Sequence, residues 1–127
     1  MKVPESLRYT ETHEWVRAES DGTLAVGITD FAQDTLGELV YVETPDPGRK
    51  LAAGESCAVV ESVKAAADVY APVAGEVVAR NAALADAPGE VNKDPYGAWL
   101  YKLRPAAGAS LDALLDAPAY RKAFGIA

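Results

Sequence analysis

The chain of 127 residues has few of the residues on which most small enzymes depend. It contains one cysteine, Cys57, and one histidine, His13. A single cysteine can form no internal disulfide and no cysteine-based metal cluster, and one histidine leaves few pairs of a nucleophile with a base. The motifs GxGxxG, GxxxxGK[ST], HExxH and GxSxG are all absent. These absences argue against a self-sufficient hydrolase or metalloenzyme.

Long hydrophobic runs and an excess of basic residues are also lacking. No run of about 18 apolar residues exists, so no membrane span is expected. The start, MKVPESLRYTETHEW, has neither an apolar signal core nor the arginines of a transit peptide, so we expect a mature cytoplasmic protein. Twelve basic against 19 acidic residues give a net charge of −7. This charge disfavours nucleic acid and anionic membranes as partners, and it can steer the chain toward basic patches on other proteins.

The length and the hydrophobic content, half of all residues, predict one domain over 1–127 with a real core. Alternating strand patterns separated by turn residues fill most of the chain. A turn at 20–22 predicts a hairpin, and Asp30 as cap with Gly37 as end predicts a short helix. Further strands are expected at 38–44, 56–62, 67–71, 76–80 and 98–104, the first of them buried on both faces, and 81–97 reads as a long irregular loop.

From Ser110 onward the hydrophobic period becomes helical. Ser110 can act as the N-cap and Gly125 can end the segment, so a C-terminal helix is predicted over about 110–125. Many short strands with a short internal helix and a terminal helix indicate a mainly β fold. We expect a small β-sandwich or barrel. Cys57 falls in a strand pattern, which favours a small buried hydrophobe over a reactive thiol.

The segment ESVKAAADVY places Lys64 in a turn between two strand patterns. The simplest interpretation is a lysine that only solvates the turn. A lysine amine is charged at neutral pH and is then a poor nucleophile, and the nearby acids Glu61 and Asp68 both favour the charged form. Lys64 is therefore not expected to be an unaided catalyst. An amine held at a tight turn between two rigid strands is, however, well placed for covalent modification by another enzyme.

The run GESCAVVESVKAAADVYAPVAGEVV resembles the prosthetic-group hairpin of lipoyl and biotinyl domains. Biotin carriers usually have Met on both sides of the lysine, whereas this chain has Val63 and Ala65. Lipoyl domains of 2-oxo acid dehydrogenases usually have Asp before it. The segments YTETHEWV, GITDFAQDTLGELVYVETPDPG, NKDPYGAWLYKL and LLDAPAYRKAF are similar, in the same order, to the H-protein family of the glycine cleavage system. The resemblance covers nearly the whole chain.

This resemblance implies a non-catalytic carrier with lipoate attached to Lys64 as an amide. In the family, the oxidised dithiolane accepts a methylamine group from a PLP-dependent glycine decarboxylase. A folate-dependent aminomethyltransferase then takes the carbon, and a flavin-dependent dihydrolipoyl dehydrogenase reoxidises the dithiol. A lipoate ligase or lipoyl transferase attaches the cofactor. Three partners that bind in turn suit polar, transient contacts, so a monomer is expected.

The resemblance also implies residues that protect the loaded group. A methylamine bound to sulfur is cationic, and a carboxylate beside it would favour that charge. The family places acids at positions matching Glu14 and Asp68, and a small hydroxyl residue at the position of Thr12. The alternative for both acids is solvated surface. His13 either tunes protonation near the arm or makes a structural hydrogen bond beside Trp15.

Three other functions compete with a glycine cleavage shuttle. The first is a lipoyl relay, an H-like protein that passes lipoate to 2-oxo acid dehydrogenases, and the lysine hairpin alone does not separate it from a shuttle. Acids suited to a cationic group favour the shuttle. The second is a biotin carrier, which Val63 and Ala65 disfavour. The third is an unmodified structural module, which the resemblance along the whole chain disfavours.

Overall fold

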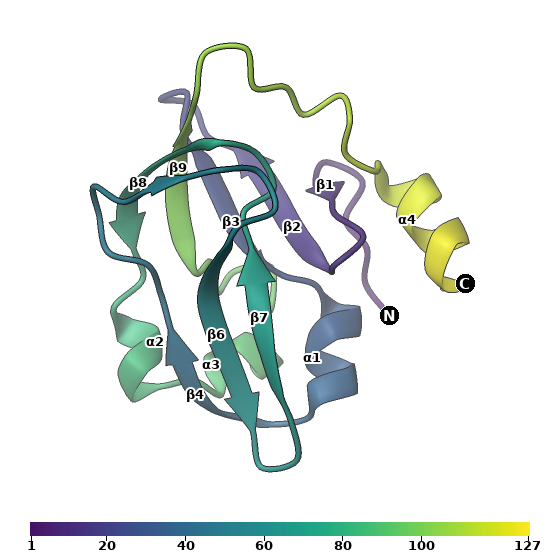
Figure 1. The fold of residues 1–127 in the computed structure, drawn as a ribbon. Coiled ribbons are helices and arrows are strands. Elements are labelled where there is room, and N and C mark those ends of the chain that lie inside the picture. The colour runs from purple at the N-terminus through teal and green to yellow at the C-terminus, as the bar shows by residue number, and fades with distance from the viewer.

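A computed structural model describes residues 1–127 as two antiparallel sheets with four short helices (Figure 1). The six-stranded sheet has the order β1-β2-β3-β9-β8-β5, and the three-stranded sheet has the order β4-β6-β7. The strands are β1 Arg8–Tyr9, β2 Glu14–Ala18, β3 Leu24–Ile28, β4 Leu39–Glu43, β5 Lys50–Leu51, β6 Ser56–Ser62, β7 Ala66–Tyr70, β8 Gly75–Arg80 and β9 Tyr101–Pro105. The helices are α1 Asp30–Leu36, α2 Ala83–Asp86, α3 Glu90–Lys93 and α4 Ala117–Phe124.

This architecture confirms the predicted mainly β fold, and no closed barrel is present. The predicted first hairpin is formed by β2 and β3, with Gly22 at φ 87°, a value that favours glycine. None of the four helices combines the length and the hydropathy that a membrane-spanning helix needs.

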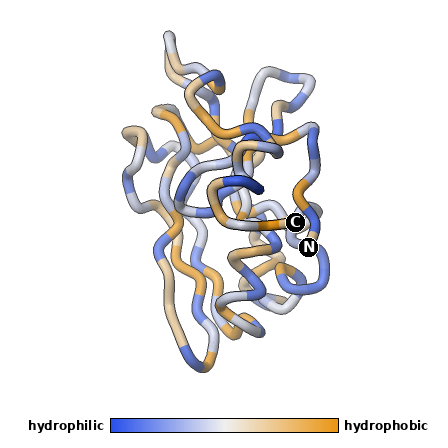
Figure 2. The backbone as a smooth tube through the Cα atoms, turned by 90° about the vertical axis from the view of Figure 1, so that its right-hand side faces the viewer, coloured by the Kyte–Doolittle hydropathy of each residue, from blue (hydrophilic) through white to orange (hydrophobic).

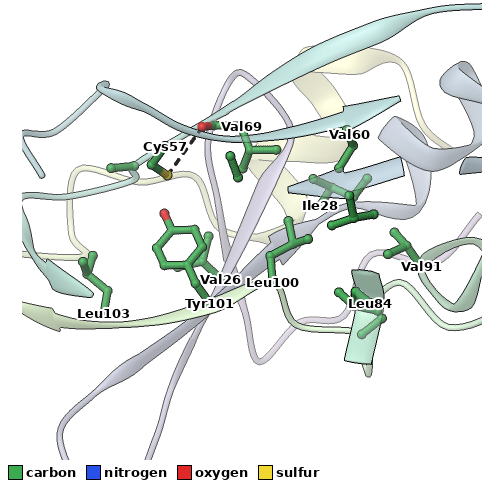
Figure 3. Packing of buried hydrophobic residues seen from close by; sticks show 14 of the residues in the cluster. Val26, Ile28, Cys57, Val60, Val69, Leu84, Val91, Leu100, Tyr101 and Leu103 are labelled. Carbon is green, nitrogen blue, oxygen red and sulfur yellow. Dashed lines mark hydrogen bonds between the residues drawn. The ribbon is translucent and has the colours of Figure 1, made fainter. Parts of the chain in front are cut away.

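The core lies between the two sheets (Figure 3). Val26 and Tyr101 of the large sheet face Cys57 and Val69 of the small sheet. The thiol of Cys57 is buried, its Sγ lies 3.5 Å from the carbonyl oxygen of Val69, and burial raises its pKa. The interpretation of Cys57 as a small buried residue is confirmed, because the thiolate is disfavoured there.

The predicted cap of the internal helix and the predicted burial of the strand after it were wrong. Thr29, not Asp30, caps α1: its side chain accepts a hydrogen bond from the Ala32 N–H, and Gly37 ends the helix as expected. Strand β4 is not buried on both faces. Val40 and Tyr41 are exposed, because β4 is an edge strand of the small sheet with a register shift between Leu39 and Tyr41.

The segment 81–97 was predicted as an irregular loop but contains two single-turn helices, α2 and α3. Each buries one apolar residue, Leu84 in α2 and Val91 in α3, in the main core. Asn92 of α3 fixes the region around the end of α1. Its side chain donates to the carbonyl of Gly37 and accepts from the N–H of Leu39. Burial of these residues gives the segment its structure.

The C-terminal helix begins later than predicted. Helix α4 starts at Ala117, and Asp116, not Ser110, caps it; Gly125 ends the helix at φ 65°, as expected. The N–H and carbonyl of Leu115 both form hydrogen bonds with Tyr9, each at 2.8 Å, which requires extended backbone there. Helix α4 packs into a second apolar cluster, and the two chain ends lie on one side of the molecule (Figures 1 and 2).

Candidate functional site

The hairpin formed by β6 and β7 projects beyond the rest of the molecule (Figures 1 and 2). A turn at its tip is closed by the N–H of Ser62 donating to the carbonyl of Ala65 at 2.7 Å, and the N–H of Ala65 donating to the Ser62 hydroxyl at 3.1 Å. Residues near the base of the hairpin, such as Cys57 and Val69, are buried in the core. The hairpin is therefore anchored at its base and exposed at its tip.

Lys64 lies at this tip and is exposed, together with Val63, whose side chain is 93% exposed. The Lys64 amine takes part in no salt bridge. The aliphatic part of its side chain passes beside Gly37, where a Cβ added to the glycine would lie 3.6 Å from Lys64 Cε. The amine is thus accessible to a modifying enzyme and carries no structural ion pair that modification would break. These features fit an amide-linked prosthetic group.

Glu14 and Thr12 lie together in a second part of the candidate site. The Glu14 side chain is only 1% exposed. The hydroxyls of Thr10 and Thr12 both donate to its Oε1, and the N–H of Tyr70 donates to Oε2 at 3.2 Å. Glu14 is therefore not ordinary solvated surface, and its carboxylate connects the start of β2 to the end of β7.

Burial raises the pKa of Glu14, and the hydrogen bonds from Thr10, Thr12 and Tyr70 oppose that shift. A carboxylate that has lost most of its water is stabilised by a nearby cation more strongly than an exposed carboxylate is. These residues line an open cavity of about 470 Å³, together with Pro72 and Leu114. The arrangement can hold a small cationic group.

Asp68 lies on β7, between Lys64 and the end of the strand that Glu14 contacts. It is exposed, and its Oδ1 accepts a hydrogen bond from the Ser56 hydroxyl at 3.1 Å. Asp68 and Tyr70 point to the same side of β7 because strand side chains alternate. The structure thus brings Thr12 and Glu14 into direct contact and places Asp68 along the path between them and Lys64.

His13, next to Glu14, makes a structural hydrogen bond, as one of the two interpretations of the sequence predicted. Its partner is Tyr120 of the C-terminal helix. Its Nδ1 lies 2.6 Å from the Tyr120 hydroxyl, and its ring packs against Phe31 and Phe124. Burial lowers the pKa of His13. His13 is also the one non-glycine residue with positive φ, at 71°.

Sequence reasoning missed two residues of the site, Thr10 and Tyr70. The spacing of Thr10 four residues before Glu14 is a signal that could have been used, because the Thr10 hydroxyl also accepts from the Glu14 N–H at 3.0 Å and closes a local turn. Tyr70 contributes only its backbone N–H. No residue-type pattern reveals such a donor.

Comparison with known proteins decides the family. The chain matches the family described as Glycine cleavage H-protein over residues 7–125. It belongs to the glycine cleavage H-protein family. The glycine cleavage system H protein of Thiobacillus denitrificans is 62% identical over 122 residues, covering 96% of this chain and 95% of the relative. That of Paraburkholderia xenovorans is 56% identical over 125 residues, covering 98% and 99%.

A solved structure shows the same fold. The glycine cleavage system H protein of Mycobacterium marinum superposes with a TM-score of 0.88 at 40% identity, covering 97% of this chain and 99% of that chain. The family assignment confirms the main functional prediction, a carrier protein of the glycine cleavage system. H proteins bear a lipoyl group as a family, and the residues described above fit such a group.

Proposed function

We propose that this H protein carries its lipoyl group on Lys64 and transports the methylamine group of glycine between enzymes. The observation that carries the proposal is the exposed Lys64 amine at the tip of an anchored hairpin, in a chain that matches the H-protein family almost end to end. When bound, the lipoyl group supplies a disulfide that accepts the methylamine group and two electrons. The remaining chemistry belongs to the partners.

The chain's own contribution begins with Lys64, which provides the amine for the amide bond. Formation of that bond removes one positive charge, so the net charge of −7 becomes −8. The closed turn between Ser62 and Ala65 fixes the point of attachment. Because a strand advances about 3.3 Å per residue and the tip is a closed turn, Asp68 lies at most about 13 Å from Lys64 and Tyr70 at most about 20 Å.

A lipoyl-lysine has about twelve bonds from Cα to a ring sulfur, which span roughly 15 Å when extended. Asp68 is therefore within reach, and the Glu14 carboxylate lies near its limit. We propose that Glu14 and Asp68 favour the positive charge of the carried group, and that Thr12 orients the Glu14 carboxylate for this purpose. The burial of Glu14 removes most of the water from its own carboxylate, which strengthens its attraction to a cation.

The partners that fit this role are the PLP-dependent glycine decarboxylase, the folate-dependent aminomethyltransferase and the dihydrolipoyl dehydrogenase, with a lipoate ligase or lipoyl transferase for modification. We propose that the chain catalyses none of these steps and acts as one carrier unit over residues 1–127. A cytoplasmic location and a monomeric state remain predictions. The buried Glu14 with its three donors favours the shuttle over a lipoate relay, because a relay has no cationic cargo to hold.

Intact-mass analysis of the protein from its own cell, followed by peptide mapping, tests the attachment site. We expect a lipoyl mass increment on the peptide that contains Lys64. The Lys64→Arg variant keeps the positive charge and should fold normally, yet it should show no glycine–bicarbonate exchange with the partner decarboxylase. A biotin increment, a bare Lys64, or near wild-type exchange by the variant would refute the proposal.

A further inference from the structure

The backbone beside Glu14 takes a conformation that is unusual for a residue other than glycine. His13 has a φ of 71°, in the left-handed region that residues other than glycine seldom adopt. The turn is closed by hydrogen bonds of its own: the N–H of His13 donates to the carbonyl of Thr10 at 3.2 Å, the N–H of Thr10 donates to the carbonyl of Glu14 at 3.0 Å, and the Thr10 hydroxyl accepts from the N–H of Glu14 at 3.0 Å. Contacts outside the turn add further stabilisation to this conformation.

The side chain of His13 supplies that stabilisation through the C-terminal helix. Its ring stacks on Phe31 at 4.7 Å between centroids and lies 4.5 Å from the ring of Phe124. Its Nδ1 is 2.6 Å from the Tyr120 hydroxyl, which in turn lies 2.8 Å from the Thr29 hydroxyl. The Thr29 N–H also donates to the carbonyl of His13 at 3.0 Å. Both the ring and the backbone of His13 are therefore fixed.

We infer that Tyr120 is a positioning residue for the Glu14 carboxylate, acting through His13 across 106 residues of sequence from Glu14. Thr12 and Glu14 flank His13 in the chain, and the Thr12 hydroxyl donates to Glu14 Oε1. If the His13 backbone leaves its left-handed conformation, Thr12 and Glu14 turn away from each other. The hydroxyl of Tyr120 thus helps to keep the Thr12 hydroxyl hydrogen-bonded to the Glu14 carboxylate.

This inference rests on the proposed function, because it assigns Glu14 a role in holding the cargo. The simpler explanation is that Tyr120 only anchors α4 in the second apolar cluster. Tyr9 offers a matched control. It is fully buried like Tyr120, its ring stacks on that of Tyr120 at 4.8 Å, and its hydroxyl donates to the carbonyl of Pro4 at 2.6 Å. Only the Tyr120 hydroxyl contacts His13.

The test compares Tyr120→Phe with Tyr9→Phe by NMR in unmodified protein. Each variant removes one buried hydroxyl and keeps the ring. In Tyr120→Phe we expect amide exchange at His13 and Glu14, whose N–H groups are hydrogen-bonded in the turn, to become roughly five- to tenfold faster, the effect of one lost hydrogen bond. We also expect the Glu14 carboxyl to titrate closer to an ordinary glutamate, because water enters where burial had raised its pKa. Tyr9→Phe should change neither quantity.

A second variant breaks the contact between His13 and Tyr120 by changing His13 instead of Tyr120. His13→Asn keeps a residue type that tolerates positive φ, but its short side chain does not reach Tyr120. It should shift the Glu14 titration in the same direction as Tyr120→Phe. The inference would be overturned if Glu14 titrated and exchanged as in the wild type in both Tyr120→Phe and His13→Asn. It would also be overturned if Tyr9→Phe shifted these quantities as much as Tyr120→Phe does.

These readouts do not depend on lipoylation, so failure of the two proposals can be told apart. A bare Lys64 in the cell would defeat the proposed function and leave the NMR result standing. In lipoylated and loaded protein, Tyr120→Phe should also release formaldehyde faster than Tyr9→Phe. Equal release by the two variants would show that the positioning of Glu14 has no bearing on the cargo.

Discussion

The Glu14→Gln substitution probes the proposed cation site most directly. A carboxylate offers about four acceptor positions. Three of them in Glu14 are occupied, by the hydroxyls of Thr10 and Thr12 and by the N–H of Tyr70. One position on Oε2 is left for the positively charged group. Glutamine has nearly the same shape but no charge, and its NH₂ group would have to face the Tyr70 N–H.

The expected magnitude follows from the loss of one charge-assisted hydrogen bond, which contributes about 1.5–3 kcal/mol. Since about 1.4 kcal/mol corresponds to a factor of ten, Glu14→Gln should release formaldehyde from the loaded protein roughly 10- to 150-fold faster than wild type. The assay loads the lipoylated protein with its partner decarboxylase, removes that enzyme, and follows formaldehyde over time.

A matched control separates this effect from a change in net charge. Glu5 is exposed and does not line the cavity beside Glu14, so Glu5→Gln changes the total charge equally without removing a buried acceptor. It should release formaldehyde at the wild-type rate. A Glu14→Gln rate within twofold of wild type, with lipoylation intact, would refute the reasoning.

Three further outcomes are expected. Asp68→Asn should speed release by roughly 1.4- to fivefold, because measured exposed charge pairs contribute about 0.2–1 kcal/mol. An unchanged rate in the same assay would remove Asp68 from the site. Gly75→Ala should lower the free energy of unfolding by about 2 kcal/mol or more in urea titrations, because the added Cβ would meet the Arg104 carbonyl oxygen. Gly89→Ala serves as the control, because a Cβ there meets open space, and it should not lower the free energy of unfolding by this amount. Burial lowers the pKa of His13 in the folded state, so its stabilising contribution is complete above the unfolded value of 6.5 and is lost as pH falls through the folded pKa. Urea titrations of wild type and His13→Asn should therefore differ in pH dependence below 6.5, and parallel curves would contradict this.

Local patterns in the sequence were enough to predict several strands and the turns between them. The strands around Lys64 and the hairpin around Gly22 were predicted because side-chain alternation and turn residues are properties of a few neighbouring positions. The family resemblance named Thr12 and Glu14 as site positions, and the structure adds the hydrogen bond between them.

Features that depend on distant partners could not be predicted in this way. The late start of α4 follows from the pairing of Leu115 with Tyr9, more than 100 residues away, which overrides a helical hydrophobic period. The exposed face of β4 follows from its position at the edge of a sheet. The hydrogen bond from the Tyr70 N–H to Glu14 depends on how the two sheets are placed against each other. None of these relations leaves a local signal.

The gradient of burial along the β6–β7 hairpin has a mechanical consequence. Cys57 and Val69 hold the base in the core, whereas Val63 and Lys64 at the tip are exposed. Opening of the last turn costs few buried contacts, so it requires far less free energy than global unfolding. An enzyme that binds the tip can therefore bend it into a narrow active site while the two sheets stay folded.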